Sequence, residues 1–111
     1  MAFRGVDYMH IDSLFSEDEL LVRRTARDFI TREFLPVIRE CYRDGRFPAQ
    51  LIPALGAMGF LGANLEGYGC AGMSNVEYGL AMQELERGDS GLRSFCSVQG
   101  SLVMYPIHAF G

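Results

Sequence analysis

Two Ser-x-x-Glu sequences, each followed by apolar residues at helical spacing, constrain the fold of this chain more than any other feature. Ser16 with Glu19, and Ser74 with Glu77, match the capping box, in which the serine and glutamate side chains bond to the first backbone N–H groups of a helix. After the first box, apolar residues recur at the helical period as far as Cys41. Both segments are therefore predicted to be helices.

Proline, glycine and serine residues divide the rest of the chain into further helical segments. We expect a first helix from about Glu17, which Pro36 kinks or restarts, and a second helix from Pro48 to Gly59. An irregular glycine-rich stretch over 59–72 should separate them from a third helix, from Ser74 to about Arg87. After a break at 88–90, Ser90 should cap a fourth helix that runs to about Met104, and Pro106 should start another. The third helix is apolar nearly all round, which predicts a central position. No stretch indicates a convincing strand, so the predicted fold is all-α, an orthogonal array of helices.

The first helix also has a charged side, which consists of Arg23, Arg24, Arg27, Asp28 and Arg32. Charged sides of this kind are usually solvated, and Asp28 and Arg32 have the spacing of an i,i+4 ion pair. We therefore expect this side to face water.

Length, charge and cysteine content limit what the chain can be. Its 111 residues suffice for one domain, predicted as an N-terminal extension over 1–15 and a helical domain over 16–111. A formal net charge of −4 argues against nucleic acid or an anionic membrane as partner. The three cysteines are widely spaced and indicate neither disulfides nor a zinc site, so no metal site is predicted. Without a signal peptide or an apolar membrane span, we expect a cytoplasmic protein.

The sequence Gly67-Tyr68-Gly69-Cys70-Ala71-Gly72 spells G-x-G-x-x-G before a helix and raises the question of dinucleotide binding. That mechanism needs a buried strand before the glycines and an acidic residue at the end of a second strand about 20 positions later. Gly and Asn interrupt the preceding residues 60–65, and Asp89, at the right distance, lies in a helix-breaking turn. We therefore favour a glycine loop between helices and predict no cofactor-binding residue in it.

Arg93 breaks a local rule, because it lies in the first turn of the helix predicted at Ser90, where the helix dipole disfavours a cation. Such exceptions are expected at functional positions. An arginine beside the free N–H groups of a helix start can hold a carboxylate or phosphate, and Glu86 can reach across 88–89 to orient its guanidinium. A surface salt bridge that merely offsets the dipole explains the same spacing, so both interpretations stay open.

Small residues follow Arg93 at helical spacing, and they are Ser94, Ser97, Gly100 and Ser101. Such a stripe leaves a groove, which either a neighbouring helix fills or a slender ligand occupies. With an arginine at its mouth, the groove would suit a short acyl chain that ends in a carboxylate.

Motifs in the second half of the chain form a long match without gaps, and they are Gly67-Tyr68-Gly69-Cys70-Ala71-Gly72-Met73-Ser74, Tyr78-Gly79-Leu80, Glu84-Leu85-Glu86-Arg87, Asp89-Ser90-Gly91-Leu92-Arg93-Ser94, Ser97-Val98-Gln99, Ser101-Leu102-Val103-Met104 and Pro106-Ile107. They closely resemble the glutaryl-CoA dehydrogenases within the acyl-CoA dehydrogenase family. The resemblance persists back to about Ser16. Its assignment to the glutaryl branch rests mainly on Glu86, Arg93 and Ser94.

The resemblance implies an enzyme of three domains, in which this chain is the helical N-terminal one, followed by a β-domain and a C-terminal helical bundle. FAD lies between the last two, a glutamate of the C-terminal domain removes a proton from the acyl-CoA, and electrons leave to an electron-transferring flavoprotein. Glutaryl members then decarboxylate the product, and a homotetramer is implied. The roles implied for this chain are substrate binding, with Arg93 on the distal carboxylate, Ser94 beside it, Glu86 holding Arg93 and Val98 lining the acyl channel.

The sequence lacks what the family needs for its chemistry, since neither a catalytic residue nor an FAD-binding residue is predicted in it. It stops in an apolar helical start at 107–111, which suggests an interruption, and the fragment alone is expected to be inactive. The alternative is a stand-alone helical interaction module, or a non-catalytic remnant, whose apolar faces dock on a partner protein.

Overall fold

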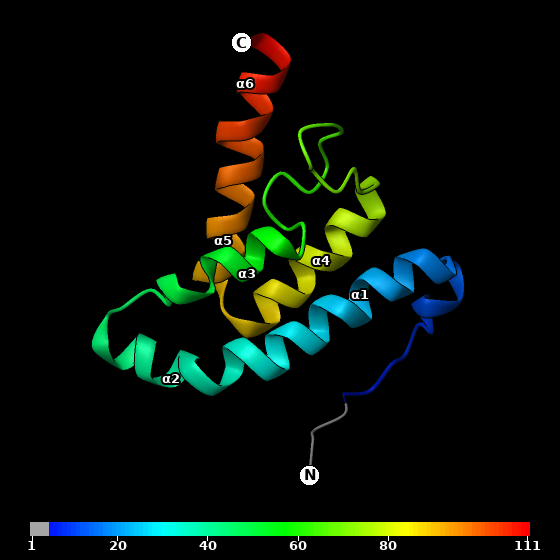
Figure 1. Cartoon of the computed structure of the whole chain (residues 1–111). Coiled ribbons are helices and arrows are strands. Elements are labelled where there is room, and N and C mark those ends of the chain that lie inside the picture. Colours follow the sequence, from blue (N-terminus) through cyan, green and yellow to red (C-terminus); the bar gives the residue numbers. More distant parts are fainter. Residues whose placement is uncertain (1–4) are drawn as a thin grey trace.

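Helices dominate the computed structural model, which describes residues 5–111 (Figure 1). The described residues contain no strand, so the predicted all-α fold is confirmed for them. In that range no helix is both long enough and apolar enough to cross a bilayer. The elements in chain order are η1 (Ile11–Leu14), α1 (Glu17–Phe29), η2 (Ile30–Phe34), α2 (Leu35–Asp44), η3 (Ala49–Leu51), α3 (Ile52–Ala57), α4 (Asn75–Gly88), α5 (Ser90–Ser97), η4 (Val98–Met104) and α6 (Tyr105–Phe110).

Both predicted capping boxes are present, at the starts of α1 and α4. The Ser16 hydroxyl accepts a hydrogen bond from the Glu19 N–H (3.2 Å), and the Glu19 carboxylate accepts one from the Ser16 N–H (3.0 Å). Ser74 and Glu77 exchange the same two bonds at 3.2 and 3.3 Å. The N-terminal ends of these two helices are therefore set by local sequence.

Pro36, Pro53 and Pro106 each occupy the second position of a helix. A backbone N–H at that position would have no partner within the helix, so the N–H that proline lacks is not missed. Pro36 restarts the first helix as α2, as predicted, and Pro106 lies at the start of α6. Before each of these two, the chain widens into a π-helical segment, η2 and η4, which keeps the helices continuous. The prediction for Pro48 is wrong, because this residue precedes η3 and α3 begins only at Ile52.

Helix α4 is the central helix, as predicted, and packs against α1 on one side and α5 on the other (Figure 1). It contributes Ala81, Met82 and Leu85 to the core. The other core residues come from the first long helix, the segment around α3, and α5, and they are Ala26, Phe29, Ile30, Phe34, Leu51, Leu55, Phe60, Leu92 and Cys96. This core fixes the end of α4 against the start of α5, where the predicted site residues lie.

Gly88 allows α4 to approach η2 closely. It is the last residue of α4, so the predicted break at 88–90 reduces to Asp89 alone. A Cβ atom on Gly88 would lie 2.9 Å from Ile30 Cγ2 and 2.9 Å from Phe34 Cδ1, and both of these side chains are buried. The absence of a side chain at this position is therefore a packing requirement.

We predict that Gly88→Ala lowers the free energy of unfolding by about 1–3 kcal/mol, because the buried Ile30 and Phe34 side chains must move. Gly79→Ala is the matched control in the same helix, since nothing lies within 4 Å of its added Cβ. There the better helix propensity of alanine should raise the free energy of unfolding by up to about 1 kcal/mol. Urea unfolding followed by circular dichroism measures both. Equal stability of the two variants would contradict the close packing at Gly88.

Candidate functional site

A single residue, Asp89, joins α4 to α5 and caps the second helix. Its carboxylate accepts hydrogen bonds from the Gly91 N–H (2.8 Å) and the Leu92 N–H (3.3 Å). The prediction that Ser90 is the cap is wrong. Both residue types are good caps, but a cap needs an extended backbone, which Asp89 has (φ −171°), whereas Ser90 is already helical.

Three of the backbone N–H groups at this helix start already have partners within the chain. Asp89 accepts the N–H groups of Gly91 and Leu92 through its carboxylate, and the N–H of Arg93 (3.2 Å) through its carbonyl oxygen. An anion bound here would therefore depend on the Arg93 side chain.

The Arg93 guanidinium is held by two partners, one at Nε and one at Nη1, and its Nη2 is open. Its Nε donates to a Glu86 carboxylate oxygen (2.8 Å), and its Nη1 donates to the Ser97 hydroxyl (3.3 Å). Within residues 5–111 its Nη2 makes no hydrogen bond, and the side chain is 38% exposed. The predicted contact between Glu86 and Arg93 is thus confirmed, and Ser97 is a further partner that the sequence did not single out for this role.

Glu86 is ionised at neutral pH in this arrangement. The hydrogen bond from the Ser90 hydroxyl (2.5 Å), followed by the one from Arg93, lowers the pKa of its carboxyl below the ordinary value. An ionised Glu86 leaves the pair with Arg93 formally neutral, so a bound carboxylate would be recognised mainly through directed hydrogen bonds.

The stripe of small residues after Arg93 is used partly by the chain itself. Ser97 bonds to Arg93, and Gly100 is buried against the loop, where a Cβ would lie 3.4 Å from the Gly62 backbone nitrogen. Ser94 is half-buried beside Arg93, and Val98 is 43% exposed at the start of η4. Close packing therefore accounts for Gly100, whereas Ser94 and Val98 remain accessible.

Two surface pockets lie near the helices, and the predicted site residues do not line them. One of about 360 Å³ lies beside Asp89 and is lined mainly by α2 and the turn after it, and one of about 540 Å³ lies between the glycine loop and the end of the chain. Neither is lined by Glu86, Arg93, Ser94 or Val98. Of these four residues, Glu86 and Val98 are exposed and Arg93 and Ser94 are half-buried.

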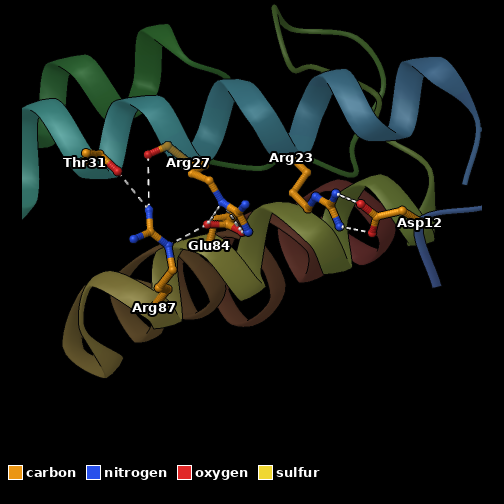
Figure 2. Close-up of polar contacts among 6 residues, drawn as sticks. All are labelled: Asp12, Arg23, Arg27, Thr31, Glu84 and Arg87. Atoms are coloured by element: carbon orange, nitrogen blue, oxygen red, sulfur yellow. Dashed lines mark hydrogen bonds and ion pairs between the residues drawn. The ribbon is translucent and has the colours of Figure 1, made fainter. Parts of the chain in front are cut away.

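A buried ion cluster, centred on Glu84, joins α4 to α1 (Figure 2). The Glu84 side chain is 3% exposed and accepts hydrogen bonds from Arg27 Nη2 (2.7 Å) and Arg87 Nε (2.8 Å). Arg87 also donates to the Thr31 hydroxyl (3.1 Å) and to the Arg27 carbonyl (3.3 Å). Burial raises the pKa of the Glu84 carboxyl, but the bonds from both arginines outweigh it, and the net pKa is lowered. Glu84 is therefore an ionised core residue.

The expectation that the charged side of α1 faces water is wrong for Arg23, whose side chain is 17% exposed and forms a two-bond ion pair with Asp12 of η1 (Figure 2). Arg27 is 54% exposed, in line with the expectation, but it also pairs with Glu84. The expected pair of Asp28 and Arg32 is replaced by a bond from Arg32 Nε to the Asp28 carbonyl oxygen (3.3 Å). The sequence signal for the buried cluster is Glu84 itself, a charged residue close to the core positions Ala81, Met82 and Leu85 of α4.

The glycine motif forms a loop with no features of a dinucleotide site. Gly67, Gly69 and Gly72 all have positive φ, and so does the exposed Tyr68 (φ 52°). No strand precedes them in the described chain, and Asp89 caps a helix instead of ending a strand. The interpretation as a turn between helices is confirmed.

The cysteines are three free thiols, and two of them, Cys41 and Cys96, are buried. Burial raises the pKa of Cys96 to about 11, so this thiol is neutral at physiological pH. Cys96 is therefore a packing residue and not a nucleophile.

Comparison with known proteins gives a match to one family and to several of its members. Residues 16–111 match the model of the acyl-CoA dehydrogenase N-terminal domain. The structure superposes on glutaryl-CoA dehydrogenase from Mycobacterium smegmatis with a TM-score of 0.91 and 54% identity, covering 95% of this chain and 27% of that one. A glutaryl-CoA dehydrogenase from Mycobacterium smegmatis in complex with FADH2 gives a TM-score of 0.88 and 45% identity, covering 90% of this chain and 26% of that one.

Curated relatives agree with this match. The mitochondrial short-chain specific acyl-CoA dehydrogenase of Bos taurus is 33% identical over 96 residues, 86% of this chain and 23% of the relative. An acyl-CoA dehydrogenase of Bacillus subtilis is 33% identical over 104 residues, 93% of this chain and 26% of the relative. The chain thus spans about a quarter of the length of these proteins. With nearly all of its helices matched to one domain model, the chain belongs to the acyl-CoA dehydrogenase family of oxidoreductases, as an N-terminal domain.

Proposed function

We propose that this chain forms the substrate-facing N-terminal domain of an acyl-CoA dehydrogenase that oxidises, and decarboxylates, glutaryl-CoA. The observation that carries the proposal is the Arg93 side chain, which Glu86 holds at Nε and Ser97 holds at Nη1 while Nη2 stays open within the described range. An arginine presented in this way can bond to a carboxylate through two N–H groups. Ser94, next to it, and Val98, one turn on, would border the end and the side of the acyl chain.

The distal carboxylate distinguishes glutaryl-CoA from other short acyl-CoA substrates, so open N–H donors on Arg93 favour this substrate class. The similarity to two solved glutaryl-CoA dehydrogenases, at 54% and 45% identity, supports the same assignment. FAD would bind between the β-domain and the C-terminal helical domain that the family resemblance implies.

The test is to read the DNA downstream of codon 111 and to purify the complete product of the reading frame. We expect the frame to continue into a β-domain and a helical domain, and the product to be yellow and to oxidise glutaryl-CoA faster than butyryl-CoA. A complete product with neither flavin colour nor acyl-CoA oxidation would overturn the proposal.

One observation favours a second candidate, the helical interaction module. Apolar side chains of η4 and α6 are exposed, among them Leu102 (70%), Ile107 (67%) and Phe110 (86%). Exposed apolar surface of this kind marks a docking face. A stop codon directly after codon 111, with a folded and monomeric product, would favour this candidate over the enzyme.

A further inference from the structure

Glu86 is fixed through both of its carboxylate oxygens by residues of the next helix. The Ser90 hydroxyl donates to Oε1 (2.5 Å), and Arg93 Nε donates to Oε2 (2.8 Å). Glu86 lies in the last turn of α4, whereas Ser90 and Arg93 lie in the first turn of α5. The carboxylate therefore connects two helices and is oriented by two donors on different sides.

Ser90 is free for this role because another residue caps the helix. Asp89 accepts the N–H groups of Gly91 and Leu92, which a serine cap would otherwise have bonded. The Ser90 hydroxyl points back to α4, and its bond to Glu86 spans one helical turn across the junction. The hydrogen bond to Glu86 therefore sets the χ1 torsion of Ser90, and the helix backbone fixes the position of the Ser90 Cα.

Without Ser90, a single bond would hold the Glu86 carboxylate. Its side chain is 46% exposed and has three rotatable torsions, so one contact to an arginine that is itself 38% exposed leaves many geometries open. A second bond at Oε1 removes rotation of the carboxylate plane and so fixes where Oε2 meets Arg93. The direction of the open Nη2 edge of Arg93 follows from that contact.

We propose that Ser90 is a positioning residue for substrate specificity, which orients Glu86 and through it the Arg93 guanidinium that receives the substrate carboxylate. This inference rests on the proposed function. Ser90 does not contact the substrate in this scheme, and its effect passes entirely through Glu86.

The test is Ser90→Ala in the complete enzyme, assayed with glutaryl-CoA and butyryl-CoA. We expect KM for glutaryl-CoA to rise about 3- to 10-fold, less than for a lost charge-assisted bond to the substrate itself because Ser90 acts only through Glu86, with kcat and the butyryl-CoA constants nearly unchanged. Ser90→Thr, which keeps the hydroxyl, should restore KM. In a Glu86→Ala background, Ser90→Ala should have no further effect, because no carboxylate remains to orient. Ser13→Ala, which removes a hydroxyl bonded only within η1 and its flank, is the control.

Several outcomes would overturn the inference, and each of them points to a different cause. Equal rises in KM for both substrates, with a lower melting temperature, would make Ser90 a structural residue of the helix junction. An undiminished effect in the Glu86→Ala background would show that Ser90 acts by another route. A wild-type enzyme that does not prefer glutaryl-CoA would remove the proposed function itself. A preference that survives Arg93→Ala would remove only the carboxylate role of Arg93, and in either case nothing would remain for Ser90 to position.

Discussion

Replacing Arg93 with alanine will raise KM for glutaryl-CoA about 100-fold in the complete enzyme and will change KM for butyryl-CoA by no more than about threefold. The two bonds of an arginine fork to a carboxylate are charge-assisted, at about 1.5–3 kcal/mol each, and together they exceed the 2.7 kcal/mol or so that a 100-fold change requires. Butyryl-CoA has no carboxylate at the far end of its acyl chain, so it has no such bonds to lose. Steady-state kinetics on the purified variant, with both substrates, give the answer.

Two further variants separate the geometry of Arg93 from its charge. Arg93→Lys keeps the positive charge but loses the planar fork, so we expect an intermediate rise in KM for glutaryl-CoA, about 10-fold. Arg24→Ala removes an exposed arginine of α1 and should leave both substrates unaffected. If Arg93→Ala weakened both substrates equally, the carboxylate role would have to be given up. If it weakened neither, Arg93 would lie outside the substrate site.

The parts of the structure that sequence predicts well are those that depend on neighbours along the chain. The two capping boxes need only residues three positions apart, and both form. The contact between Glu86 and Arg93 spans seven positions across one helix break, and it forms because the break is a single residue. The choice between Asp89 and Ser90 as cap could not be made, because two adjacent good caps differ only in the backbone conformation that the surrounding packing imposes.

The parts that sequence could not predict depend on how distant helices cross. Arg27 and Glu84 are 57 positions apart, so nothing in the period of α1 distinguishes Arg27 from an arginine in water. Gly100 meets the loop at Gly62, a close approach that only the folded chain creates. Spacing alone therefore could not show that Gly100 of the small-residue stripe packs against another segment of the chain.

Glu84→Gln will lower the free energy of unfolding by about 2–4 kcal/mol at pH 7, even though it changes neither the size nor the shape of the side chain. The substitution leaves Arg27 and Arg87 around a neutral amide, whose own N–H groups cannot bond to an arginine. The two arginine side chains are 54% and 38% exposed and can partly turn to water, which keeps the loss below that of a fully buried pair. Urea unfolding of the purified chain measures it. Glu40→Gln, on the exposed side of α2, should change stability by less than about 0.5 kcal/mol.

The difference between wild type and Glu84→Gln should itself depend on pH, which tests the cause. The arginines hold the pKa of the Glu84 carboxyl below its ordinary value of 4.5, so the folded state binds this proton less readily than the unfolded state. The stabilisation from Glu84 is therefore fully present above pH 4.5 and is lost as pH falls through the lowered pKa. Asp12 and Glu86 also have lowered pKa values, but they titrate in both proteins and cancel from the difference. A stability difference that stays constant from pH 7 to pH 3 would mean that Glu84 stabilises the fold by packing and not by its charge.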